Sequence, residues 1–140
     1  MNSNQHELMS RVATTLRRDI GPKVADDYAR TQAFMAAVVL DKLGRQLLLA
    51  PEHEVADYRD AEALCHELAP LLAGDQVVES ILAAVAAVRS SPGDGAPLSR
   101  LVAALYEARG ALGEDKFAQA LSLVRAVLRK RVDRQMEYSA

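Results

Sequence analysis

The stretch YARTQAFMAAVVLDKLGRQLLL, residues 28–49, predicts a long helix around which the rest of the chain is organised. Its apolar side chains recur every four residues, at Met35, Val39, Leu43 and Leu47. This spacing is that of a helix and not the alternation of a strand. Asp26 or Asp27 can cap the first free backbone amides, and Pro51 disfavours helical geometry at the residue before it. We therefore expect a central helix over about residues 26–49 that buries this stripe.

Length and composition fit one globular domain over residues 1–140. Half of the residues are hydrophobic and 26% are charged, which argues against a disordered or a membrane protein. The longest uncharged apolar run, residues 33–40, is far shorter than the roughly 20 residues that a membrane-spanning helix needs. No signal-peptide pattern opens the chain, so we expect a cytoplasmic protein. The net charge of −2 argues against nucleic-acid binding by the whole surface.

Further helical segments flank the central helix on both sides. Their expected ranges are about residues 4–19, 51–74, 75–89, 97–112 and 114–132. A left-handed cap at Gly21 should end the first, Pro51 should open the next, and Asp75 should cap the one whose stripe begins at Val78. With short connections and no strand, these segments predict an all-α, single-domain antiparallel bundle of about five or six helices.

The segment PEHEVADYRDAEALCHE, residues 51–67, gathers side chains that could ligate a metal ion. They are Glu52, His53, Glu54, Asp57, Glu62, His66 and Glu67. The pairs His53 with Asp57 and Glu62 with His66 are four residues apart, so each pair shares a helix face. Carboxylate-bridged metal centres in helix bundles use Glu-x-x-His pairs from two helices, and this chain contains none. We interpret the segment as a solvated acidic face and predict no bound metal.

The sequence contains no constellation typical of catalysis. Cys65, the only cysteine, is next to His66, but adjacent helix residues point about 100° apart. Because Cys65 falls on an apolar stripe, we expect it to be a small buried hydrophobic residue. The loop SSPGDGA, residues 90–96, lacks the lysine and the preceding strand of a phosphate-binding loop. We therefore predict a non-enzymatic protein without a cofactor.

The last predicted helix is basic. Its cations are Arg125, Arg129, Lys130, Arg131 and Arg134. We favour the interpretation that these cations stay solvated near the negative end of the helix dipole. They could instead bind nucleic acid, although a helix-turn-helix and interleaved aromatic residues are missing. They could also pair with the acidic face, in the same chain or in a second copy, which fits the charge asymmetry best. The predicted interaction surface comprises these five cations together with Glu52, Glu54, Asp57 and Glu62.

Both ends of the chain resemble one protein family. LRRDIGPKVADDYARTQAFMAAVVLDKLGRQL, residues 16–47, resembles the opening of a family of short, uncharacterised bacterial helical proteins encoded beside aminoglycoside-phosphotransferase-like kinases and acyl-CoA dehydrogenases. VRAVLRKRVDRQMEYS, residues 124–139, is similar to the family's closing helix and tyrosine-containing tail, although Gln135, Met136 and Glu137 replace its usual asparagine and proline. The resemblance implies an accessory role near a kinase or an acyl-CoA pathway, with no catalytic residues to carry over.

Three functional hypotheses follow from these features. The first is a non-enzymatic accessory bundle that forms a homo-oligomer or binds a protein partner, such as a phosphotransferase-like kinase. The second is the binding of a small acyl or aromatic ligand in a pocket between helices. The third is nucleic-acid binding through the basic last helix, which predicts strong salt dependence.

Overall fold

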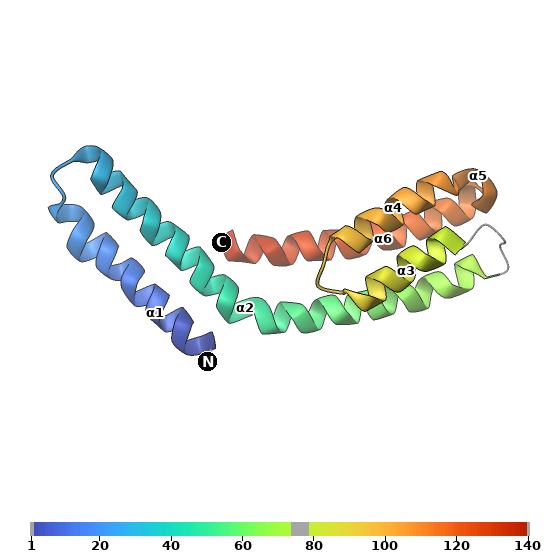
Figure 1. Cartoon of the computed structure of the whole chain (residues 1–140), viewed down its shortest axis with the longest axis horizontal. Coiled ribbons are helices and arrows are strands. Elements are labelled where there is room, and N and C mark those ends of the chain that lie inside the picture. Colours follow the sequence, from blue (N-terminus) through green and yellow to red (C-terminus); the bar gives the residue numbers. More distant parts are fainter. Residues whose placement is uncertain (1, 74–78, 140) are drawn as a thin grey trace. The chain divides into compact units, whose positions relative to one another are not determined.

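The computed structural model describes residues 2–73 and 79–139, and nearly all of them are helical (Figure 1). The elements are α1 (Asn2–Thr15), a π-helical turn η1 (Leu16–Ile20), a 3₁₀ turn η2 (Gly21–Lys23), α2 (Asp27–Leu72), α3 (Glu79–Ser90), α4 (Ala96–Glu107), α5 (Arg109–Leu112), α6 (Glu114–Met136) and a 3₁₀ turn η3 (Glu137–Ser139). These residues include six α-helices and no strand, which confirms the predicted all-α fold.

The chain divides into two compact units, and each is described by itself. The hairpin unit comprises Met1–Glu52 with Gln135–Ala140, and the bundle unit comprises His53–Arg134. The helix α2 contributes its first half to the hairpin unit and its second half to the bundle unit. The single domain over residues 1–140 stays a prediction.

The helix α2 runs without a break through Pro51. The predicted boundary between a central helix of residues 26–49 and a new helix at Pro51 is therefore wrong. Proline in a helix interior removes one backbone hydrogen bond and costs about 3 kcal/mol. On the two sides of the proline, Ala50 is half-buried and His53 is buried. The predicted cap is confirmed at Asp26, whose Oδ2 accepts a hydrogen bond from the Ala29 amide at 2.8 Å.

The bundle unit encloses a core of large aliphatic side chains. The second half of α2 lies with α3, α4 and α6 around this core, and successive long helices run in opposite directions (Figure 1). The largest fully buried side chains are Leu64, Leu68, Ile81, Leu98, Leu101, Leu105 and Val124. Fully burying one such side chain contributes about 1.5–3 kcal/mol relative to leaving it exposed. Asp75 and Val78, the predicted cap and first stripe residue of the fourth helix, lie outside the described residues.

The hairpin unit pairs α1 side by side with the first half of α2 (Figure 1). Its fully buried described residues are all small: Ala13, Gly21, Ala37 and Gly44. The carbonyl oxygen of Gly44 lies 3.0 Å from His6 Nδ1. A Cβ atom on Gly44 would come within 3.3 Å of the same nitrogen. The two helices are therefore joined by close backbone approach and not by large core side chains.

Gly21 makes the turn at the end of the hairpin in an unexpected way. Its φ of −51° and ψ of −49° are right-handed, so the predicted left-handed cap is wrong. A Cβ atom at this position would lie 2.8 Å from Cε1 of Phe34 and 2.9 Å from the carbonyl oxygen of Leu16. The missing side chain thus makes room for the ring of Phe34, which lets the first half of α2 fold back on α1.

Candidate interaction surface

The apolar stripe that defines the central helix in the sequence is exposed in the structure. On α2, the exposed fractions of Met35, Val39 and Leu43 are 54%, 51% and 44%. On α1, those of Leu8 and Val12 are 63% and 42%. The prediction that Met35, Val39 and Leu43 are buried is therefore wrong for the single chain.

The physical reason is that α1 packs on a different side of α2. That side carries Ala37 and Gly44, both buried, and a Cβ atom on Gly44 would also meet Met9 at 3.4 Å. Small residues permit the closest approach of two helix backbones, as the 3.0 Å contact between His6 and Gly44 requires. The larger side chains of Met35, Val39 and Leu43 lie on another side of α2 and are therefore exposed to solvent.

Several of the exposed apolar side chains share one side of the hairpin, whereas Val38, at 40% exposure, lies on the side of Arg17 and Asp41. Arg17 Nη2 lies 2.7 Å from Asp41 Oδ2, and His6 Nδ1 lies 3.0 Å from the carbonyl oxygen of Gly44, so two polar contacts join the antiparallel helices. Applying about 100° per residue along each α-helix separates an apolar side from the side of the ion pair. The apolar side, called the apolar face below, comprises Leu8, Val12, Leu16, Ala36, Val39, Leu43 and Leu47.

The opposite side of the hairpin carries charged side chains. A surface cavity of about 390 Å³ on that side is lined in part by His6, Ser10, Arg17, Asp41 and Arg45, together with the apolar Val38 and Leu40. The side chains of Arg17 and Asp41 are 45% and 44% exposed, so their ion pair remains hydrated. The hairpin is therefore amphipathic, with one side suited to water and the other to an apolar partner.

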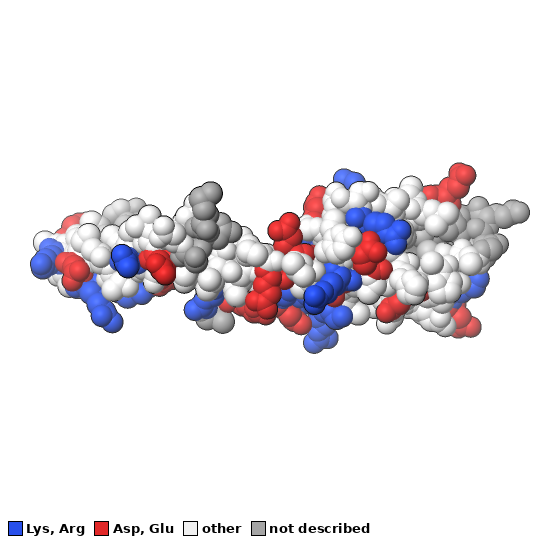
Figure 2. All heavy atoms as spheres, turned by 90° about the horizontal axis from the view of Figure 1, so that it is seen from below, with Lys and Arg blue, Asp and Glu red and all other residues white. Residues whose placement is uncertain are grey.

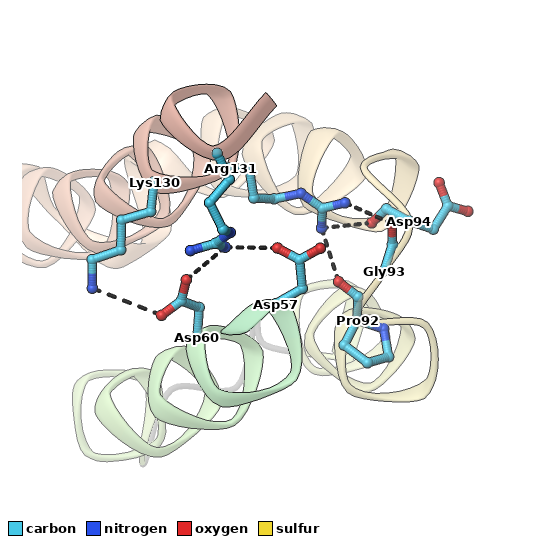
Figure 3. Close-up of polar contacts among 8 residues, drawn as sticks. Asp57, Asp60, Pro92, Gly93, Asp94, Lys130 and Arg131 are labelled. Atoms are coloured by element: carbon cyan, nitrogen blue, oxygen red, sulfur yellow. Dashed lines mark hydrogen bonds and ion pairs between the residues drawn. The ribbon is translucent and has the colours of Figure 1, made fainter. Parts of the chain in front are cut away.

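In the bundle unit, part of the predicted basic surface meets part of the predicted acidic surface (Figure 3). Arg134 Nη2 donates to Asp57 Oδ1 at 2.6 Å and to Asp60 Oδ2 at 2.8 Å. Lys130 Nζ lies 3.8 Å from Asp60 Oδ1. The basic residues were expected to pair with the acidic face either within one chain or in a second copy. These ion pairs form within one chain. Asp60 was not among the predicted residues, although its spacing of three from Asp57 places both carboxylates on one helix face.

The Arg134 guanidinium is held in a largely desolvated position. Its side chain and those of Asp57 and Asp60 are only 16%, 18% and 16% exposed. Burial lowers the pKa of Arg134, but the hydrogen bonds and charges of the two carboxylates outweigh burial and raise the pKa. Its Nε atom is buried without a hydrogen-bond partner among the described residues. Desolvation therefore offsets part of the attraction, and the trio serves to fix α6 against α2.

Arg131 ties the α3–α4 loop to α6 (Figure 3). Its Nη1 donates to the carbonyl oxygens of Pro92 at 2.9 Å and Asp94 at 3.2 Å, and its Nη2 donates to that of Gly93 at 2.7 Å. The loop was predicted from its glycine and proline content. Its partner on α6 lies 37 to 39 residues away, so local sequence could not indicate it.

The remaining predicted surface residues are distributed over the chain. Arg125 Nη2 donates to the Tyr106 hydroxyl at 3.3 Å, and Glu62 Oε1 lies 3.3 Å from Arg89 Nε. Exposed positions are held by Arg129, Glu52 and Glu54. Figure 2 shows that basic and acidic side chains are intermingled on the displayed face of the molecule. That face lacks the continuous basic stripe by which proteins bind duplex nucleic acid.

Cys65 is buried, as predicted, with an exposed fraction of 6%. Its Sγ atom lies 3.8 Å from the carbonyl oxygen of Val85. Burial raises the pKa of the thiol, although the charge of Arg89 acts in the opposite direction. Because the thiolate is the reactive form, this environment disfavours nucleophilic chemistry at Cys65. Among the described residues, no group of three or more His, Cys, Asp or Glu side chains is arranged to hold a metal ion.

Comparison with known proteins gives no match: neither a protein-family model, nor a curated protein, nor a solved structure matches the chain. Within residues 2–73 and 79–139, no helix combines the length and the apolar character needed to cross a membrane.

Proposed function

We propose that this protein is a non-enzymatic interaction protein whose hairpin unit binds an apolar protein surface through the apolar face. The observation that carries the proposal is the exposure of Val39 and Leu43, at 51% and 44%, on a stripe whose spacing is typical of a buried helix face. Contiguous apolar surface rimmed by polar residues is typical of protein interaction sites. The polar side of the same hairpin supplies that rim.

The energetics of the hairpin support the proposal. Isolated helices as short as the 14-residue α1 are marginal in water, and tertiary packing normally supplies most of their stability. Here the packing between α1 and α2 buries only alanine and glycine completely. Covering one half-exposed Leu or Val side chain contributes about 1 kcal/mol. A partner on the apolar face would therefore stabilise the hairpin as well as bind to it.

The bundle unit encloses a core of its own. Its helices share a continuous aliphatic core, and Arg134 fixes α6 against α2 from the outside. The family resemblance supports an accessory role for such an assembly, serving an enzyme such as a phosphotransferase-like kinase or an acyl-CoA dehydrogenase. The proposal thus assigns recognition to the hairpin unit and structural support to the bundle unit.

The test is native mass spectrometry of the untagged protein purified gently from its source extract. We expect a discrete assembly that contains this chain and at least one further polypeptide chain, identical or different. Leu43→Glu, on the apolar face, should abolish the assembly, whereas Val38→Glu, at 40% exposure on the polar side, should preserve it. A monomer in the wild type, with no stoichiometric polypeptide, would contradict the proposal.

A second candidate function is the binding of a small acyl or aromatic compound. It is favoured by a shallow depression of about 460 Å³ on the bundle unit, lined in part by Leu71, Ala118 and Leu123. A retained mass of small-molecule size in the same spectrum would support it. A thermal-shift screen tests it independently, because a bound ligand raises the melting temperature by mass action.

A further inference from the structure

We infer that the apolar face packs against the same face of a second copy of this chain, so that two hairpins form a four-helix bundle about a twofold axis. The inference rests on the proposed function and names the partner. The structural reason is that no second layer of helices among the described residues of the hairpin unit covers the apolar face. Helical domains pack one layer of helices on another, and the hairpin provides one layer of two helices.

The chemistry of the apolar face favours self-association. The residues assigned to the face are leucine, valine and alanine, and the charged side chains of Glu7 and Arg11 border it beside Leu8, where they line a surface depression. In a twofold interface the same patch of both copies meets, so a charged residue at the centre would face the same charge on the partner and be repelled. The cations Arg17 and Arg45 lie on the polar side of the hairpin and remain in water when the apolar faces meet. Self-packing therefore keeps charged side chains at the edge of the interface and away from its centre.

The dimensions of the hairpin match what a stable dimer needs. The two helices overlap over about 20 residues, which corresponds to a length of about 30 Å. Two helices side by side are about 20 Å wide, so the face presents about 600 Å². Two copies would bury about 1,200 Å² in total, which is the lower end of the range for specific protein interfaces. Ala36, a small residue within the face, leaves room for a larger side chain of the partner.

The experiment is sedimentation equilibrium of the purified full chain over a range of concentrations. We expect a dimer of twice the chain mass of 15.2 kDa that dissociates on dilution. Val12→Glu on α1 and Leu43→Glu on α2 should each raise the dissociation constant at least about 100-fold, because the twofold axis buries two unpaired charges. The matched control is Val38→Glu, which should change it less than about threefold.

Two further measurements keep the result decisive. Far-UV circular dichroism shows whether each variant retains its helices. Should a glutamate unfold the hairpin, Leu43→Gln, which keeps the side-chain length and the helix propensity, should still weaken the dimer about 10-fold.

The inference is overturned if the wild type is a monomer throughout, or if Val38→Glu weakens a dimer as much as Leu43→Glu. If the chain is a monomer alone but is recovered from its source with a different polypeptide that Leu43→Glu releases, the proposed function stands and the second copy is excluded as the partner. If Leu43→Glu affects neither kind of assembly, both the inference and the proposed function fail.

Discussion

The bundle unit and the hairpin unit carry apolar stripes of the same helical spacing, but the stripes differ in how far they are buried. In the bundle unit the stripes meet in a common core, in which Leu101 and Leu105 are 0% exposed. In the hairpin unit, Val12 and Leu43 remain 42% and 44% exposed. Four helices can surround a core, whereas two helices can only lie against each other. An apolar stripe thus predicts burial without showing whether the same chain provides the covering surface.

The largest expected effect contrasts a leucine of the core with a leucine of the apolar face. Leu101→Ala should lower the free energy of unfolding by about 3 kcal/mol, because it removes buried methyl groups and leaves a cavity. Leu43→Ala should lower it by less than about 1 kcal/mol at concentrations where the chain is a monomer. Denaturant unfolding followed by circular dichroism measures both values. Equal losses at the two positions would remove the distinction between the units.

The next effect concerns the charges that fix α6 in the bundle unit. Arg134→Met should lower the free energy of unfolding by about 2–3 kcal/mol, because Asp57 and Asp60 would stay largely desolvated without their partner. The matched control is Arg129→Met on the same helix, an exposed position where the change should be within about 0.5 kcal/mol. A similar small change for both variants would show that the trio contributes nothing to the bundle unit.

A smaller effect tests the close approach within the hairpin unit. Gly44→Val should push α1 away from α2, because even a Cβ atom would lie 3.3 Å from His6 Nδ1. We expect a loss of about 1–2 kcal/mol, confined to the hairpin and visible as faster amide hydrogen exchange in α1. Gly110→Ala is the control, because a Cβ atom at Gly110 has no described neighbour within 4 Å. Unchanged exchange in α1 after Gly44→Val would mean that the two helices are not held by this contact.

The smallest effect is the pH dependence contributed by Cys65. Burial raises the pKa of its thiol in the folded chain, so the unfolded chain releases the thiol proton at a lower pH. The associated stability is fully present below the ordinary thiol pKa of about 8.5 and is lost as the pH rises through the folded value. The free energy of unfolding should therefore fall more steeply above pH 9 in the wild type than in Cys65→Ala. Parallel curves for the two proteins would contradict the burial of the thiol.

The helical periodicity was enough to predict the all-α fold and most of the core of the bundle unit. Ile81, Leu101 and Val124 fall on predicted stripes, and each is fully buried, whereas Tyr106 and Val132 fall on the same stripes and are 46% and 53% exposed. Periodicity could not predict that α2 continues through Pro51, because the outcome depends on how the turns on both sides pack. It also could not identify Gly44 as the point of closest approach, since a glycine inside a helix usually weakens it.

The candidate interaction surface was harder to predict from the sequence than the fold. Spacing identified the stripe of Met35, Val39 and Leu43, but a stripe does not distinguish an intramolecular from an intermolecular contact. Pairing of the last helix with the acidic segment was one of three open interpretations, and the contact of Arg134 with Asp57 is of this kind. No sequence pattern could indicate that Arg131 binds the carbonyl oxygens of the loop, because every residue has a backbone oxygen.

Amide hydrogen exchange of the purified full chain as a function of protein concentration would show whether the hairpin lacks a covering surface in the single chain. We expect that, at the lowest concentration, amides of α1 and of residues 27–50 exchange much faster than those of the bundle core around Leu101. Raising the concentration should slow exchange in the hairpin and leave the bundle core unchanged, because only the hairpin gains a covering surface. Hairpin amides that are as well protected as the bundle core in a dilute monomer would contradict the account.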